Sequence, residues 1–158
     1  MLLVQRAAHD SMPLRWEIPG GACDLEDETI LHGLARELWE EAGLKMTGVV
    51  RQVGGEYVFL TRRGMGVSRV TFEVEVETPA STESEGGLQK ETLPEVVLDP
   101  NEHARFLWAT EEEVRTGRVA VLGGSGEAEV VDVDFTTKHQ RAAILLGFKL
   151  RGEPAATE

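Results

Sequence analysis

The chain has 158 residues, which suits one domain with a substantial buried core. Its 28 acidic residues outnumber its 16 basic residues, and the resulting formal net charge of −12 disfavours long nucleic acids and anionic membranes as partners. A single cysteine excludes an internal disulfide, and we find neither a signal peptide nor an apolar run long enough to span a membrane, so we expect a cytoplasmic protein.

Two short strands are predicted near the N-terminus. Residues 2–6 form the first, and residues 16–18 form a second that ends in a turn, Pro19-Gly20-Gly21. Because Gly20 and Gly21 carry no side chains, the backbone of this turn can approach a ligand closely. An acidic segment over residues 24–28 leads from the turn into the next element.

A helix is predicted over residues 29–42. Thr29 can cap its N-terminus, and Gly43 suits a left-handed cap at its C-terminus. An apolar stripe recurs at helical spacing, which is typical of a helix half buried on a core. The stripe consists of Leu31, Leu34, Ala35, Leu38 and Ala42.

Three glutamates of this helix point to metal binding. Glu37, Glu40 and Glu41 are spaced i, i+3 and i+4, so they project from one side of the helix. Each like-charge pair costs roughly 0.2–0.5 kcal/mol on an isolated helix, and a hard divalent cation would reverse this repulsion because it prefers carboxylate oxygens. The competing interpretation is an ordinary solvated acidic face, which does not account for the adjoining Pro-Gly-Gly turn.

These segments resemble the signature of the Nudix hydrolases, G-x5-E-x7-R-E-U-x-E-E-x-G-U, in which U is a bulky apolar residue. Residues 36–44 match it at every specified position, and counting back from Arg36 places the first glutamate at Glu28. Six residues rather than five separate Gly21 from Glu28, which we interpret as a one-residue insertion within loop residues 22–27.

The resemblance implies an α+β protein with the Nudix fold, in which a mixed β-sheet is sandwiched between α-helices. We expect a single domain over residues 1–151 and a flexible tail over residues 152–158. Family members usually carry a further strand and loop ahead of the first strand seen here, so the resemblance also implies a trimmed N-terminus.

Further strands are predicted downstream. Residues 56–61 and 70–76 read as two strands around a turn at residues 62–66, and the second strand alternates apolar and polar side chains. Residues 79–95 read as a long loop, either a lid or an idle insertion. Residues 101–108 form another predicted strand.

The C-terminal third supplies two more predicted helices. Thr110 caps a short one, and Glu113 completes a capping box. Residues 136–151 form a terminal helix that covers one face of the sheet. The glycine-rich segment 123–126 lacks the spacing of a phosphate-binding loop, so we assign it no chemistry.

The metal site that the resemblance implies holds one to three Mg²⁺ or Mn²⁺ ions. Its ligands are the three helix glutamates, a carbonyl at Gly20 or Gly21, and Glu102, because many Nudix proteins add a glutamate that lies shortly before a tryptophan. The neighbouring His103 is a candidate base, but adjacent strand residues point to opposite faces, so we expect at most one of the two, Glu102 for preference, to reach the metal. Arg36 is expected to pair with Glu28 and to hold the loop against the helix.

The implied reaction is hydrolysis of a diphosphate linkage in a nucleoside diphosphate derivative or a related organic pyrophosphate. A metal-activated water attacks phosphorus, with Glu37 or else Glu102 as the general base and Glu41 as a further catalytic carboxylate. Arg6 is a candidate for binding phosphates, and Trp16 or Tyr57 for stacking on a base, with core packing as the competing role of both rings.

Two other functions stay open. One is a Nudix-fold binding or regulatory module that recognises a nucleotide without turnover. The other is a diphosphate isomerase, which would need a catalytic cysteine elsewhere than at Cys23. We expect a small-molecule nucleotide or organic diphosphate as the substrate, no membrane partner, and a homodimer as the candidate assembly.

Overall fold

The computed structural model describes residues 1–61, 63–79, 93–122 and 128–152. Its strands and helices are, in chain order, β1 (Leu2–Arg6), β2 (Trp16–Glu17), α1 (Ile30–Ala42), β3 (Met46–Gln52), β4 (Tyr57–Leu60), β5 (Gly66–Arg69), β6 (Phe72–Val76), β7 (His103–Trp108), α2 (Glu111–Thr116), β8 (Arg118–Leu122), β9 (Ala128–Asp132) and α3 (Lys138–Arg151). The predicted loop over 79–95, the segment 123–126 and the tail 152–158 lie largely outside the described residues.

Strand β1 is the middle strand of an antiparallel sheet with the order β2-β1-β7. Successive side chains of a strand point to opposite faces, and β1 is apolar on both. Leu3 is buried in one core, whereas Leu2 and Val4 are buried in another. A parallel bridge between Trp16 and Phe135 extends this sheet and makes it mixed.

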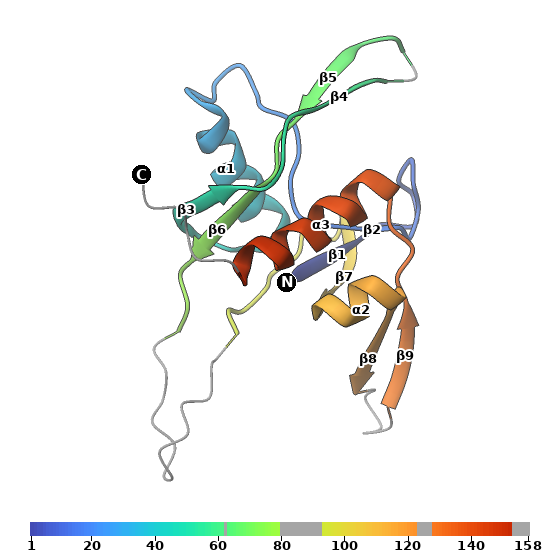
Figure 1. The fold of residues 1–158 in the computed structure, drawn as a ribbon. Helices are drawn as coiled ribbons and strands as arrows, with labels where there is room; N and C mark the ends of the chain where they lie inside the picture. The colour runs from blue at the N-terminus through green and yellow to red at the C-terminus, as the bar shows by residue number, and fades with distance from the viewer. Residues whose placement is uncertain (62, 80–92, 123–127, 153–158) are drawn as a thin grey trace.

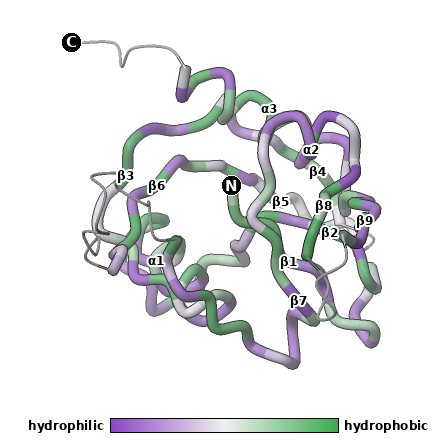
Figure 2. Tube along the Cα trace, turned by 90° about the horizontal axis from the view of Figure 1, so that it is seen from below, coloured by the Kyte–Doolittle hydropathy of each residue, from purple (hydrophilic) through white to green (hydrophobic). Residues whose placement is uncertain are grey.

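Helices cover both faces of this sheet, as predicted. Leu38 of α1 packs on the core that contains Leu2 and Val4, whereas Val114 of α2 and Ile144 of α3 pack on the core around Leu3. Figure 1 shows α3 crossing β1, with α1 beside β3 and β6. In Figure 2, β1 lies near the middle of the molecule, between α1 on one side and β8 and β9 on the other. The protein is therefore a layered α+β sandwich.

Helix α1 begins and ends where its capping residues predict. The hydroxyl of Thr29 accepts a hydrogen bond from the His32 N–H at 3.2 Å. Gly43 adopts a left-handed conformation with φ 65°, and its N–H donates to the Trp39 carbonyl at 2.8 Å. The capping box of α2 is confirmed as well, with Thr110 and Glu113 bonded reciprocally.

Strand pairing differs from the prediction for the middle of the chain. Strand β4 pairs with β5 in a hairpin, and β6 pairs with β3 rather than with β4. The alternating sequence of β6 specifies a strand with one buried face, but not which strand lies beside it. Strands β3, β5, β8 and β9 were not predicted. Across the described ranges, no helix is both long and apolar enough to cross a bilayer.

Candidate metal centre

Three side chains converge where β7 begins and α1 ends. Glu41, Glu102 and His103 each offer one possible ligand atom, and these three atoms lie within 4.8 Å of one another. Glu41 lies in the last turn of α1 and is only 7% exposed, and His103 is only 3% exposed. Glu102 lies in the turn before β7 and is exposed.

A register shift in the sheet explains why Glu102 and His103 both reach this point. Gln5 lies opposite Arg105, but the next residue, Arg6, lies opposite His103, so Ala104 is bulged. A bulge re-aims a side chain, and here it places His103 on the same face as Arg6. Glu102 precedes the strand, so strand alternation does not govern it. The expectation that only one of these neighbours reaches the centre is therefore corrected.

The buried carboxyl of Glu41 is held by the turn after β2. The Gly20 N–H donates to Oε2 of Glu41 at 2.7 Å, and Gly20 has φ 146°, a conformation that favours glycine. Burial, with a smaller contribution from the Glu102 and Glu37 carboxylates, raises the pKa of Glu41 to about 7, although the Gly20 hydrogen bond and His103 oppose this change. A group in this state accepts a nearby cation readily.

His103 connects the centre to a series of charged side chains beside the sheet. Its Nε2 lies 3.7 Å from Oε1 of Glu17, which also accepts a hydrogen bond from Arg6, and Arg6 in turn donates to Asp10 at 2.6 Å. Burial alone would lower the pKa of His103, but Glu17 and Glu41 outweigh it, so the pKa is raised.

Arg36 fixes the loop that leads into α1, but its partner is Asp27 rather than Glu28. Its Nη2 and Nε donate to the two carboxylate oxygens of Asp27 at 2.9 and 3.2 Å, and Nη2 also donates to the Ala22 carbonyl at 2.9 Å. Glu28 lies outside this set of contacts, and its side chain is 84% exposed beside His32. The hydrogen bond from Arg36 lowers the pKa of Asp27.

The pairing of Arg36 with Asp27 changes where the one-residue insertion in the motif is placed. Five residues separate Gly21 from Asp27, which is the spacing of the family signature, so the additional residue lies between Asp27 and the helix. The acidic residue at that spacing is an aspartate, and its carboxylate binds Arg36 as the signature glutamate was expected to do. Counting forward from Gly21, rather than back from Arg36, would have identified Asp27.

The remaining predicted ligands lie around Arg36. Its Nη1 donates to Glu37 at 3.0 Å and to Glu40 at 2.9 Å, so Arg36 contacts these glutamates as well as the loop. The Gly21 backbone lies against the Glu37 carboxylate so closely that a side chain on Gly21 would collide with it. Burial, with the Glu40 and Glu102 charges, raises the pKa of Glu37. The side chain of Glu40 is 55% exposed.

The predicted substrate-binding residues have structural partners. Trp16 is completely buried in the core, beneath the guanidinium of Arg105, and has no free face for a base. Tyr57 stacks on His139 of α3 with ring centroids 3.6 Å apart. Arg6 is bonded to Glu17 and Asp10. Core packing accounts for Trp16, and the contact with α3 accounts for Tyr57.

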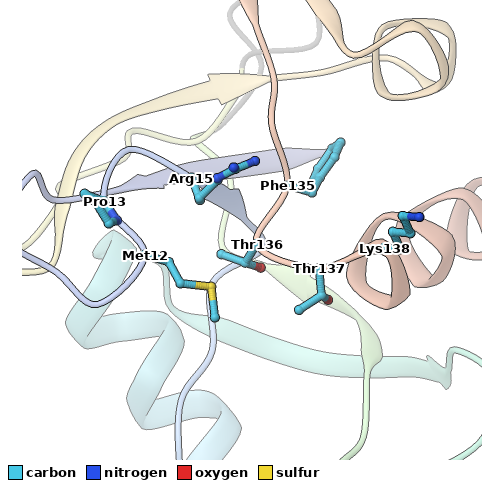
Figure 3. Close-up of a pocket in the computed structure, with 7 residues that line it drawn as sticks. All are labelled: Met12, Pro13, Arg15, Phe135, Thr136, Thr137 and Lys138. Atoms are coloured by element: carbon cyan, nitrogen blue, oxygen red, sulfur yellow. The ribbon is translucent and has the colours of Figure 1, made fainter.

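Two cavities adjoin the described elements. One of about 520 Å³ lies at the start of α3, where Arg15, Thr136 and Lys138 line it (Figure 3). It contains none of the predicted carboxylates. The other, of about 610 Å³, lies between the layers and has a mainly apolar lining, to which Pro19 and Leu38 contribute. Because Pro19 directly precedes Gly20, whose N–H binds Glu41, this second cavity adjoins the candidate centre.

Comparisons with known proteins bear on this arrangement. A family model described as the NUDIX domain matches residues 1–124. A "MutT-like protein" of Streptomyces ambofaciens is 37% identical over 81 residues, which are 46% of this chain and 49% of that protein. The "m7GpppN-mRNA hydrolase NUDT17" of Homo sapiens is 35% identical over 115 residues, which are 70% of this chain and 34% of that protein. The chain thus spans about half and about a third of the length of these two relatives.

A solved structure shares the fold. The MutT protein from Methanosarcina mazei Go1 superimposes with a TM-score of 0.61 and 19% sequence identity, over 97% of this chain and 85% of that one. At this identity the likeness concerns the fold alone. Since the NUDIX family model covers most of the chain and the structure has the matching layers, this protein belongs to the Nudix family.

Proposed function

We propose that this protein is a divalent-metal-dependent hydrolase that cleaves a diphosphate linkage in a nucleoside diphosphate derivative or a related organic pyrophosphate. The observation that carries the proposal is the convergence of Glu41, Glu102 and His103 within 4.8 Å at the end of the motif helix. Family membership supports the same reaction class.

The donor set fits a divalent cation. Two carboxylates and an imidazole gather at one point. Burial raises the pKa of Glu41. Among the described hydrogen bonds of the Glu41 carboxylate, none comes from a lysine or an arginine. When bound, Mg²⁺ or Mn²⁺ supplies positive charge to the diphosphate and acidity to a coordinated water. We assign Glu41 and Glu102 as ligands, with Glu37 and Glu40 as the flanking carboxylates.

Other residues position the carboxylates or act as the general base. Gly20 holds the Glu41 carboxylate through its N–H, and Arg36 orients Glu37. Glu37 is the proposed general base, and Glu102 is the alternative base if it is not a ligand. Loss of the base should lower kcat with little change in metal affinity, whereas loss of a ligand should weaken metal binding first. Glu37→Gln and Glu102→Gln, each measured for kcat and for Mn²⁺ affinity, separate these roles.

We assign the organic group of the substrate to the cavity between the layers. Its lining is mainly apolar, and Pro19 connects it to the turn that holds Glu41. Trp108 also lines this cavity. A non-hydrolysable nucleotide analogue should therefore change the tryptophan fluorescence of a Trp39→Phe variant, in which Trp108 is accompanied only by Trp16, completely buried in the other core.

The activity is tested with a panel of nucleoside di- and triphosphates, nucleotide sugars, dinucleoside polyphosphates and a cap dinucleotide, the last because NUDT17 is named as an m7GpppN-mRNA hydrolase. Products are resolved by chromatography with Mg²⁺, with Mn²⁺ and with EDTA. We expect metal-dependent cleavage that Glu41→Gln abolishes. Glu112→Gln, an equivalent change on the exposed surface of α2, should retain it.

A different result would favour the binding module. A folded protein that binds metal and nucleotide but cleaves no member of the panel would contradict the hydrolase assignment. Trp108 fluorescence then measures nucleotide binding without requiring turnover.

A further inference from the structure

We propose that His103 is a nitrogen ligand of the cation at this centre, which makes the site a mixed carboxylate–imidazole site that favours Mn²⁺ over Mg²⁺. The inference rests on the proposed metal-dependent function and goes beyond it, since an acidic motif by itself predicts oxygen ligands only. It concerns the ligand set and can be tested without any substrate.

The state of the imidazole is the first support. His103 is 3% exposed, and its Nδ1 is buried with no hydrogen-bond partner among the described residues. A buried polar atom without a partner is costly and rare in folded proteins. The ring nevertheless offers a nitrogen within 4.8 Å of carboxylate oxygens of both Glu41 and Glu102. A cation bound at Nδ1 would give this atom a partner.

The surroundings of the ring are the second support. Nε2 of His103 lies 3.7 Å from Glu17, a carboxylate that is itself only 8% exposed. Arg6 holds Glu17 in place. Metal-ligating histidines commonly direct their other ring nitrogen to a carboxylate, which fixes the orientation of the ring. With Nε2 near Glu17, we assign Nδ1 as the coordinating nitrogen.

The ligand chemistry sets the metal preference. Carboxylate oxygens bind Mg²⁺ and Mn²⁺ alike, whereas an imidazole nitrogen suits transition metals and contributes little to Mg²⁺. A site with two carboxylates and one imidazole therefore favours Mn²⁺ relative to a site made of carboxylates alone. Loss of the imidazole should reduce this preference.

The test is pulsed electron paramagnetic resonance of Mn²⁺ bound to the protein without substrate. We expect nitrogen modulation from a directly bound imidazole, and we expect the frequencies to change when the four histidines are labelled with ¹⁵N. The labelling experiment uses the unsubstituted protein, so it does not depend on whether a variant folds. Bound Mn²⁺ without any histidine nitrogen signal would overturn the proposal.

Two variants locate the signal. His103→Gln should abolish the nitrogen modulation and weaken Mn²⁺ binding by about 10-fold or more, while Mg²⁺ affinity changes much less. His32→Gln, the same substitution on the exposed side of α1, should retain both. A nitrogen signal that persists in folded His103→Gln would contradict the assignment.

The outcomes for ligation and for activity are separable. A nitrogen signal in a protein that cleaves nothing would support His103 as a ligand and contradict the hydrolase. Metal-dependent cleavage with no nitrogen signal would support the hydrolase and overturn the ligand. A protein that binds neither Mn²⁺ nor Mg²⁺ would overturn both.

Discussion

Asp27 and Glu28 are adjacent acidic residues with different surroundings. Asp27 accepts two hydrogen bonds from Arg36 and its side chain is only 8% exposed, whereas Glu28 is solvent-exposed near His32. A bidentate arginine–carboxylate pair fixes geometry as well as charge. At this position in the chain, one residue therefore holds the loop in place and its neighbour does not.

We predict that Asp27→Ala weakens Mn²⁺ binding by about 10-fold, the usual range for a residue that supports metal ligands from outside. Without Asp27, Arg36 loses its bidentate partner, and the loop that carries Gly20 and Gly21 is held less firmly. Isothermal titration with Mn²⁺ measures the effect. Glu28→Ala is the matched control and should bind normally, so equal losses in the two variants would contradict the pairing.

The buried carboxyl of Glu41 makes the stability of the metal-free protein depend on pH. Burial raises its pKa from the ordinary value of 4.5 to about 7, so in this window the folded state binds a proton that the unfolded state releases. The free energy of unfolding then falls as the pH rises from 4.5 to 7. The raised pKa of His103 acts in the same direction above pH 6.5.

We predict that in EDTA the Tm of the protein decreases between about pH 5 and pH 8, because titration of Glu41 lowers the free energy of unfolding by at most about 1.4 kcal/mol per pH unit. Glu41→Gln should flatten this dependence because glutamine does not titrate. Circular dichroism at a series of pH values measures it, and Glu112→Gln serves as the control. A Tm that rises across this range would show that Glu41 is not buried as described.

At the scale of elements, an aromatic contact joins the β4–β5 hairpin to α3. A two-stranded hairpin is marginally stable alone, and within the described residues β4 and β5 pair only with each other. Tyr57 stacks on His139, which anchors the start of β4 to α3. Figure 1 shows the rest of the hairpin extending away from the layers.

We predict that Tyr57→Ala speeds amide hydrogen exchange across β4 and β5 by about 3- to 10-fold, which corresponds to the loss of an aromatic pair. The amides of α1 should be unaffected. Val58→Ala is the control in the same strand, because Val58 is 65% exposed. Equal effects of the two changes, or faster exchange in α1, would contradict an anchoring role for Tyr57.

At the scale of the whole molecule, β1 joins the two cores. Leu3 is fully buried on the side of α2 and α3, and Val4 is fully buried on the side of α1. Leu3 and Val4 are adjacent residues of the same strand. Unfolding of either core should therefore detach β1 from the other core as well. We therefore propose that the described part of residues 1–151 folds as one cooperative domain.

We predict a single unfolding transition in urea for the protein and for Leu3→Ala and Val4→Ala, with a loss of about 2–5 kcal/mol for the leucine. Far-ultraviolet circular dichroism and tryptophan fluorescence should give coincident curves. An exposed apolar residue, Leu60, supplies the control through Leu60→Ala. Separate transitions in either core variant would show that the two layers unfold independently.

The sequence by itself determined the local features of this protein. Helix α1, its caps and the capping box of α2 depend on residues within one or two turns of one another, so spacing along the chain predicts them. The run of residues 36–44 likewise carries the family signature without any tertiary contact. The family was therefore evident before the structure was known.

Only the tertiary structure decided which distant groups meet. The partner of β6, the choice of Asp27 by Arg36, and the bulge that turns His103 toward Glu41 each depend on contacts between segments far apart in the chain. Alternation predicts the face of a regular strand, but a bulge changes the face, and its cause lies in the pairing with β1. For this reason the glutamates were predicted from sequence, whereas only the fold brought His103 to the same point as Glu102.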